Sequence, residues 1–194
     1  EENKLDSRPI VALLAGSRRQ EISKCLPIMV AMADKFPTFQ FLVAAAPGIE
    51  RGYYNQFLTS SVKIVSDSTY ALLDESYAAI VNSGTATLET GLLKVPQVVV
   101  YHVIGVRIAS LLKKILIKTR YISLVNLVAE TEVVKELVAH EFTSEQVHAE
   151  LNRILTDSSY YEQIKAGYNK LEQRLGESGT AHRAAVAITA SLRK

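Results

Sequence analysis

The residues best suited to bind a ligand form a short run of small and polar side chains, Asn82 to Glu89, directly after the apolar stretch Tyr77 to Val81. This order predicts a strand, a tight turn and the first turns of a helix, where free N–H groups favour an anion. Glu89 would lie one turn into that helix, where its carboxylate can accept the paired hydroxyls of a ribose. A phosphate cradle and a diol acceptor at this spacing predict a nucleotide or nucleotide-sugar site.

A second turn of the same kind follows the strand-like run Pro9 to Ala15. Gly16 lets the backbone approach a ligand closely, Ser17 can donate a hydrogen bond, and Arg18 can form a bidentate contact with phosphate oxygens. One such turn is a weak indication, because small turns end the strands of most α/β proteins. Two of them in one chain favour a binding site over two purely structural turns.

Short apolar runs alternate with longer helical patterns, which is typical of a parallel sheet built from crossover units. We therefore predict an α/β fold, a Rossmann-like open parallel sheet with helices on both faces. The predicted strands are Ile10–Leu14, Phe39–Ala44, Val62–Val65, Ala78–Val81 and Gln97–Tyr101, and the helices between them are Gln20–Lys35, Glu50–Phe57, Tyr70–Asp74 and Thr85–Leu93. Gly91 is expected to weaken the last of these helices locally.

After Tyr101 helical patterns predominate, with a turn expected at Val125-Asn126. The predicted helices of this part are Val103–Lys118, Val133–His140, Ser144–Leu155, Ser158–Leu175 and Ala181–Leu192. The chain thus divides into a polar lead-in over residues 1–8, one domain over residues 9–176 and a C-terminal helix within residues 177–194.

Ligands of an open parallel sheet bind outside the carboxyl ends of its strands. Four of the predicted strands end in small or polar turns, at residues 16–18, 46–48, 66–68 and 82–85. Because the strands are parallel, all four turns would lie on one edge of the sheet. We place the candidate site at that edge.

The composition fits an ordinary globular protein of 194 residues, with 48% hydrophobic and 22% charged residues and a formal net charge of +2. The small net charge and the lack of a recognisable motif argue against a nucleic-acid-binding protein. The single cysteine, Cys25, cannot form an internal disulfide, which fits a reducing compartment. No apolar run approaches the ~20 residues that span a bilayer, no signal peptide is recognisable, and the start without Met favours a piece of a longer polypeptide.

Three groups of residues together resemble the lipid-A-disaccharide synthase family. They are Leu13 to Arg18 with Glu21-Ile22, Asn82 to Glu89 followed by Leu93 to Pro96, and Tyr121 to Asn126. The likeness covers most of the chain and matches only the carboxyl-terminal half of those enzymes. It implies one half of a GT-B fold, in which two Rossmann-like domains face a cleft and the carboxyl-terminal one holds the nucleotide-sugar donor.

The resemblance also implies a reaction and a setting. The donor would be UDP-2,3-diacylglucosamine and the acceptor 2,3-diacylglucosamine 1-phosphate, giving the β-1,6-linked lipid A disaccharide with release of UDP and inversion at the anomeric centre. It implies no metal or other cofactor, and a cytoplasmic protein peripheral on the inner membrane of a Gram-negative bacterium. Residues 177–194 would pack toward a missing amino-terminal domain, which would also supply the general base. The chain alone should then bind donor weakly and not turn over.

Carried onto this sequence, the family's roles fall on residues of the turns described above. Arg18, which would neutralise charge as UDP departs, and Asn126 are the expected catalytic residues. The turns at residues 16–18 and 83–85 would contact the diphosphate, Glu89 would accept the ribose hydroxyls, and Ser66 to Thr69 would lie near the uracil. The expected donor-binding residues are Gly16, Ser17, Arg18, Ser66, Ser83, Gly84, Thr85 and Glu89.

Two positions depart from the family's pattern, since Val125 replaces a proline and Glu130 replaces a glycine. Two other interpretations stay open: a different UDP-N-acetylglucosamine-type GT-B enzyme (an epimerase or the peptidoglycan N-acetylglucosaminyltransferase), and a non-catalytic nucleotide-binding module. The basic amphipathic stretch Arg107–Arg120 fits either a helix that packs on the sheet or one that lies on an anionic membrane surface. The sequence predicts no oligomeric state.

Overall fold

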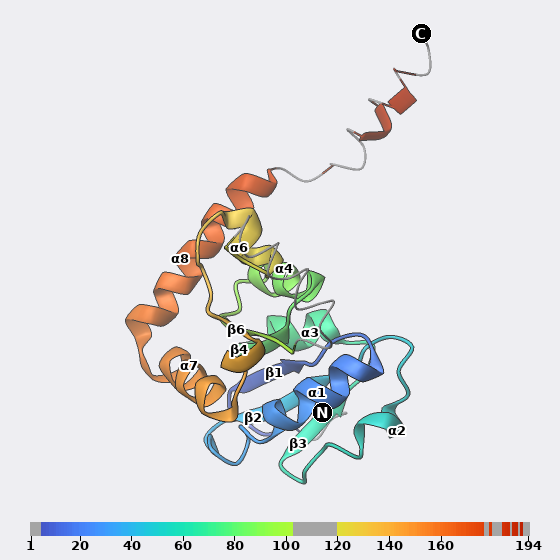
Figure 1. The fold of residues 1–194 in the computed structure, drawn as a ribbon, viewed down its shortest axis with the longest axis vertical. Coiled ribbons are helices and arrows are strands. Elements are labelled where there is room, and N and C mark those ends of the chain that lie inside the picture. The colour runs from blue at the N-terminus through green and yellow to red at the C-terminus, as the bar shows by residue number, and fades with distance from the viewer. Residues whose placement is uncertain are drawn as a thin grey trace.

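Six parallel strands form a single sheet in the order β3-β2-β1-β4-β5-β6 in the computed structural model (Figure 1). The structure describes residues 5–102, 120–176, 179, 184–186, 188–189 and 191. The strands are β1 (Ile10–Leu14), β2 (Gln40–Ala44), β3 (Val62–Val65), β4 (Ser76–Asn82), β5 (Gln97–Tyr101) and β6 (Glu136–Val138). All six therefore direct their carboxyl ends to the same edge of the sheet.

Helices cover both faces of the sheet, as predicted. They are α1 (Arg19–Val30), α2 (Arg51–Tyr54), α3 (Thr69–Asp74), α4 (Thr85–Leu92), α6 (Leu124–Ala129), α7 (Ser144–Thr156) and α8 (Ser158–Leu175), with a 3₁₀ turn, η1 (Ala139–Glu141), after β6. The predicted helices Val103–Lys118 and, for the most part, Ala181–Leu192 lie outside the described residues.

The two apolar cores follow from the alternation of side chains along β1, all of which is buried. Val11 and Leu13 face one side, where the core also contains buried residues of α1, α7 and α8. Ala12 and Leu14 face the other, where the core contains Leu72 and Leu73 of α3. A central strand covered on both faces has no polar alternation, which is why its sequence is a continuous apolar run.

The predicted helix over Val133–His140 is wrong in the structure. Residues 136–138 form β6, whose Leu137 pairs with Val100 of β5, and only the turn η1 follows it. The spacing of Val133, Val134 and Leu137 fits one face of a helix, but the free edge of β5 offers backbone hydrogen bonds to an extended segment. Strand pairing therefore decided the structure of this stretch.

One further local prediction is also wrong. The turn expected at Val125-Asn126 is instead the first part of α6, whose N-terminal N–H group at Asn126 is capped by the Ser123 hydroxyl. Gly91 lies within α4 and marks a close approach between helices. A Cβ at this position would lie 3.1–3.2 Å from side-chain atoms of Leu171, Tyr168 and Val125.

A second glycine contact gives a testable expectation for stability. At Gly167 of α8 an added Cβ would lie 2.6 Å from Cγ1 of Val133, so we expect Gly167→Ala to lower the free energy of unfolding by about 1–3 kcal/mol. This loss would outweigh the better helix propensity of alanine, about 1 kcal/mol. Urea denaturation measures it. Gly52→Ala is the matched control, since nothing lies within 4 Å of a Cβ there; equal effects of both substitutions would contradict the packing argument.

Candidate functional site

A cavity of about 540 Å³ opens at the carboxyl edge of the sheet, where the sequence places the site. Segments that follow β1, β2, β3 and β4 all contribute to its wall. Of the expected donor-binding residues, all except Ser66 line it. The cavity-lining residues are Leu14, Gly16, Ser17, Arg18, Glu21, Ala44, Ala45, Ala46, Pro47, Thr69, Tyr70, Asn82, Ser83, Gly84, Thr85, Ala86 and Glu89.

Gly16 is required by geometry in the turn after β1. Its φ of +109° lies in the region that L-amino acids rarely adopt, and an added Cβ would lie 2.6 Å from Glu21 Oε2 and 2.9 Å from Asn82 Nδ2. The turn therefore passes directly beneath two polar side chains from other parts of the wall. Only glycine permits this approach.

Glu21 occupies the position over this turn. Its Oε2 accepts hydrogen bonds from the backbone N–H groups of Ser17 (3.0 Å) and Arg18 (3.3 Å), and its Oε1 accepts one from the Arg18 guanidinium (2.9 Å). The three donors that we expected to meet a diphosphate thus meet a carboxylate of the chain itself. Sequence reasoning assigned Glu21 no role, although an acidic residue in the first helical turn is a known stabilising feature.

Asn82 closes the floor between the two turns. It is the last residue of β4 and is buried, and its Oδ1 accepts a hydrogen bond from the thiol of Cys25 in α1 at 3.4 Å. Burial raises the pKa of Cys25 to about 12, so the thiol stays protonated and remains a donor. Cys25 is therefore a core residue, as predicted, that also orients a side chain of the cavity.

The turn after β4 leads into α4, and the first N–H groups of this helix are not used by the chain. Gly84 precedes the helix in an extended conformation, and the Thr87 backbone N–H and hydroxyl both donate to its carbonyl oxygen. Among the described residues, the N–H groups of Thr85 and Ala86 find no acceptor. Both residues line the cavity, so this helix start presents two free donors and the positive end of its dipole to a ligand.

Glu89 lies one turn further along α4, on the cavity wall and half-buried. Within the described part of the chain its carboxylate makes no hydrogen bond or ion pair. A half-buried carboxylate without a partner is ready to accept donors from a ligand.

The segment after β3 contributes an aromatic side chain that sequence reasoning missed. Ser66 is exposed and does not line the cavity, whereas Thr69 and Tyr70 of α3 do. The Tyr70 side chain is 62% exposed. Its ring is available to stack on a planar ligand group. Arg19, next to the expected Arg18, instead lies over the Tyr53 ring at 5.0 Å.

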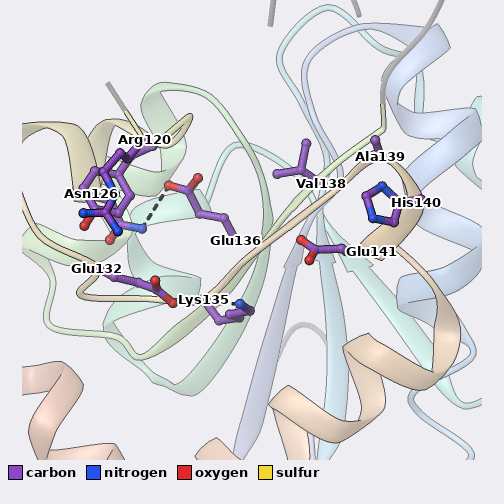
Figure 2. Close-up of a pocket in the computed structure, with 10 residues that line it drawn as sticks. Arg120, Asn126, Glu132, Lys135, Glu136, Val138, Ala139, His140 and Glu141 are labelled. Carbon is purple, nitrogen blue, oxygen red and sulfur yellow. Dashed lines mark hydrogen bonds and ion pairs between the residues drawn. The ribbon is translucent and has the colours of Figure 1, made fainter. Parts of the chain in front are cut away.

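The structure does not bring Asn126 together with the other expected residues. Asn126 is fully buried, and the chain itself supplies every hydrogen-bond partner of its side-chain amide. Figure 2 shows one of these contacts, with Glu136. Oδ1 accepts from the N–H groups of Val133 (2.8 Å) and Val134 (3.1 Å), and Nδ2 donates to the Val134 carbonyl oxygen (2.8 Å) and to Glu136 (2.9 Å). These contacts tie α6 to the segment that leads into β6.

Glu136 is the second centre of this network. Besides Asn126, its carboxylate accepts hydrogen bonds from the N–H groups of Ile122 (2.8 Å) and Ser123 (3.0 Å) and from the Ser123 hydroxyl. A second cavity, of about 370 Å³, lies beside the network and is lined by Asn126 and Glu136 together with Lys135 and His140 (Figure 2). The network holds the backbone of residues 122–136 in place.

Glu130 adopts a left-handed conformation, with φ of +52°, at the C-terminal end of α6. That is a conformation that glycine favours, which explains why a glycine was expected there. The Glu130 carboxylate forms an exposed ion pair with Arg174 at 2.8 Å. Glu130 thus adopts a glycine-like conformation and adds a contact with α8.

The described residues lack two features. No group of three or more His, Cys, Asp or Glu side chains there is arranged to hold a metal ion. Within the same residues, no helix has the length and apolar character needed to span a bilayer. The stretch Arg107–Arg120, for which a membrane surface was one interpretation, lies outside the described residues except for Arg120.

Comparison with known sequences gives a consistent result. Residues 1–190 match the family model described as lipid-A-disaccharide synthetase. The lipid-A-disaccharide synthase of Myxococcus xanthus is 37% identical over 187 residues, covering 93% of this chain and 48% of the relative. That of Geobacter sulfurreducens is 32% identical over 194 residues, covering 96% and 50%. The chain thus spans about half the length of the curated relatives it matches.

Solved structures share the fold at low sequence identity. The calicheamicin glycosyltransferase CalG4 gives a TM-score of 0.61 at 16% identity, with 98% of this chain and 45% of that chain covered. The glycosyltransferase SnogD from Streptomyces nogalater gives 0.58 at 19%, with 96% and 44% covered. The glycosyltransferase VinC, solved in complex with DTDP, gives 0.57 at 16%, with 87% and 38% covered. The described sheet and helices are one half of this glycosyltransferase fold.

Proposed function

Because the chain belongs to the lipid-A-disaccharide synthase family, we propose that it is the donor-binding half of an inverting glycosyltransferase. The cavity at the sheet edge would bind the UDP part of UDP-2,3-diacylglucosamine. The observation that carries this proposal is Glu89, a half-buried carboxylate without a partner among the described residues, one helical turn from two free N–H groups. Such a pair suits the two ends of a nucleoside diphosphate, its phosphates and its ribose.

The proposed pose follows from the donors and acceptors on the wall. The diphosphate would lie against Ser83, Gly84 and Thr85, where the free N–H groups and the dipole of α4 favour negative charge. The ribose hydroxyls would donate to Glu89. The uracil would reach Thr69 and the exposed Tyr70 ring rather than Ser66, since only the former two line the cavity. The glycosyltransferase VinC, which shares the fold, was solved in complex with DTDP.

Arg18 would supply the charge that stabilises the leaving group. Its side chain is 79% exposed and held by a single ion pair, so it can move onto the phosphate as the sugar–phosphate bond breaks. Electrostatic stabilisation of this kind is commonly a large catalytic contribution. We propose that the reaction needs no metal or other cofactor, because the helix start and Arg18 would share the charge of the departing UDP.

For the whole protein, we propose transfer onto 2,3-diacylglucosamine 1-phosphate to form the β-1,6-linked lipid A disaccharide. The general base would come from an amino-terminal domain that faces this cavity. Acylated substrates favour a cytoplasmic protein peripheral on the inner membrane of a Gram-negative bacterium. Asn126 enters this proposal as a residue that positions the loop beside the site, because its amide has no hydrogen-bonding capacity left for a ligand.

We expect Glu89→Ala to weaken UDP binding at least tenfold, since a hydrogen bond to a charged acceptor is worth about 1.5–3 kcal/mol. Calorimetric titration of the chain measures the loss. The same titration with 2′-deoxy-UDP identifies its cause: wild type should bind this analogue more weakly than UDP, whereas Glu89→Ala should bind both alike.

The matched control is Glu75→Ala at the far end of α3, which removes the same charge away from the cavity. This variant should bind UDP as wild type does. Discrimination between UDP and its deoxy analogue that survives in Glu89→Ala would show that another group contacts the ribose. No saturable binding of UDP to folded wild-type chain would contradict the proposed site.

A further inference from the structure

We propose that Glu21 is an internal substitute for the donor's diphosphate, which must be displaced when the nucleotide binds and which returns when the nucleotide leaves. This inference rests on the proposed function. It concerns a side chain to which neither the family resemblance nor the sequence pattern gave a role. The geometry of the turn after β1 carries it.

The first step is the identity of the donors that Glu21 occupies. The N–H groups of Ser17 and Arg18 and the Arg18 guanidinium all point to one carboxylate, over distances of 2.9–3.3 Å. A carboxylate and a phosphate both present oxygens that accept such bonds. The turn is therefore an anion-binding turn that already contains an anion.

The second step is the position of the carboxylate in the cavity. Glu21 lines the cavity wall and its side chain is only 24% exposed. Its Oε2 lies 2.6 Å from the point where a Cβ on Gly16 would be. The carboxylate thus fills the concave space that the glycine leaves open, and a phosphate group cannot enter that space while Glu21 remains there.

The third step is the charge of the cavity. Among the described residues that line it, the ionised side chains are Arg18, Glu21 and Glu89. With Glu21 in place, its charge cancels that of Arg18, and a diphosphate would face a net negative wall. Rotation of Glu21 out of the cavity would leave a wall of zero net charge, in which Arg18 and two N–H groups are free to bind an anion.

The fourth step is that the exchange is easy in both directions. Arg18 is largely exposed, and ion pairs with an exposed member are weak, so the closed arrangement is held chiefly by the two backbone N–H bonds, which a phosphate can replace. A ligand that binds only the open arrangement has its apparent affinity reduced by the fraction of closed molecules. Glu21 would therefore loosen UDP binding and speed the release of the product nucleotide.

The test compares UDP and uridine as ligands of wild type and Glu21→Gln. The amide keeps the size of the side chain but is a weaker acceptor, so the closed arrangement loses stability. We expect UDP to bind Glu21→Gln about fivefold more tightly than wild type, the change in equilibrium constant that one exposed helix cap typically supports. Uridine has no phosphate to place in the turn, so its affinity should not change.

Two controls separate this role from a structural one. Glu89→Gln neutralises the other carboxylate of the wall and should weaken UDP binding, so a gain on Glu21→Gln would not reflect a general loss of negative charge. Glu21→Asp keeps the charge but is one methylene shorter; it should also tighten UDP binding, and it serves as the second variant if Glu21→Gln fails to fold. The amide NMR signals of Ser17 and Arg18 should shift when UDP is added to wild type.

The outcomes are distinct. Unchanged or weaker UDP binding by folded Glu21→Gln, or an equal gain for uridine, would overturn the role of Glu21 and leave the proposed site intact. Failure of both wild type and Glu21→Gln to bind UDP would overturn the proposed function itself, and the role of Glu21 with it. A gain for UDP alone supports both.

Discussion

Replacing Asn126 by alanine is expected to lower the free energy of unfolding by about 3 kcal/mol or more, a large share of the ~5–15 kcal/mol of a typical domain. The substitution removes a side chain whose two acceptor and two donor contacts are all used. It leaves the N–H groups of Val133 and Val134 without an acceptor in a buried region. A buried donor without a partner costs about 1–3 kcal/mol. Urea denaturation followed by circular dichroism measures the loss.

Two further variants test this explanation. Asn126→Asp has the same shape, but it puts a carboxylate where an N–H group now lies 2.9 Å from Glu136, so it should be at least as damaging at neutral pH. Asn152→Ala, at an exposed position on α7, should change stability little. If Asn126→Ala were as stable as wild type yet lost UDP binding, Asn126 would act on the ligand and its network would be secondary.

The second large effect is expected for Gly16→Ala. Alanine would have to adopt a φ of +109° and place its Cβ 2.6 Å from Glu21 Oε2 and 2.8 Å from Glu21 Cβ. We expect the turn to move, stability to fall by about 2–3 kcal/mol, and UDP binding to weaken at least tenfold, since strain and overpacking act together. Thermal denaturation and UDP titration on the same preparation measure the two effects.

Gly48→Ala is the control that separates backbone strain from steric contact. Gly48 also has a positive φ, of +80°, beside the cavity residue Pro47, but nothing lies within 4 Å of a Cβ there. This variant should lose about 1 kcal/mol of stability from conformation alone and keep its UDP affinity. Equal loss of binding in both variants would mean that the close approach at Gly16 does not shape the site.

Much of the sheet could be predicted from sequence, because its strands are buried on both faces. The runs Ile10–Leu14 and Gln97–Tyr101 lack polar alternation and lie between clear turn signals, and both strands have the predicted bounds. The exception was β6. Its pairing depends on the free edge of β5, which lies far away in the chain. The local sequence of Glu136–Val138 therefore does not predict a strand.

The candidate site could be predicted in part. Glycine, serine and threonine after buried strands identified both turns, because the need for close approach is visible in the residue type. The partners of polar side chains were not visible. Nothing in the sequence shows that Glu21 turns back onto Ser17, or that Asn126 is buried against Val133 and Val134. The resemblance therefore placed Asn126 with the ligand-binding residues, whereas the structure places it in a separate network.

The central position of β1 has a consequence for the time at which this protein can fold during synthesis. Leu13 pairs with Val43 of β2 on one side and with Ile80 of β4 on the other. The ribosome therefore adds Ile80 67 residues after Leu13. At ~5–20 residues per second, that interval is roughly 3 to 13 s. Throughout it, one edge of an entirely apolar strand has no neighbour, and this is the period in which the nascent chain is most exposed to aggregation and to chaperones.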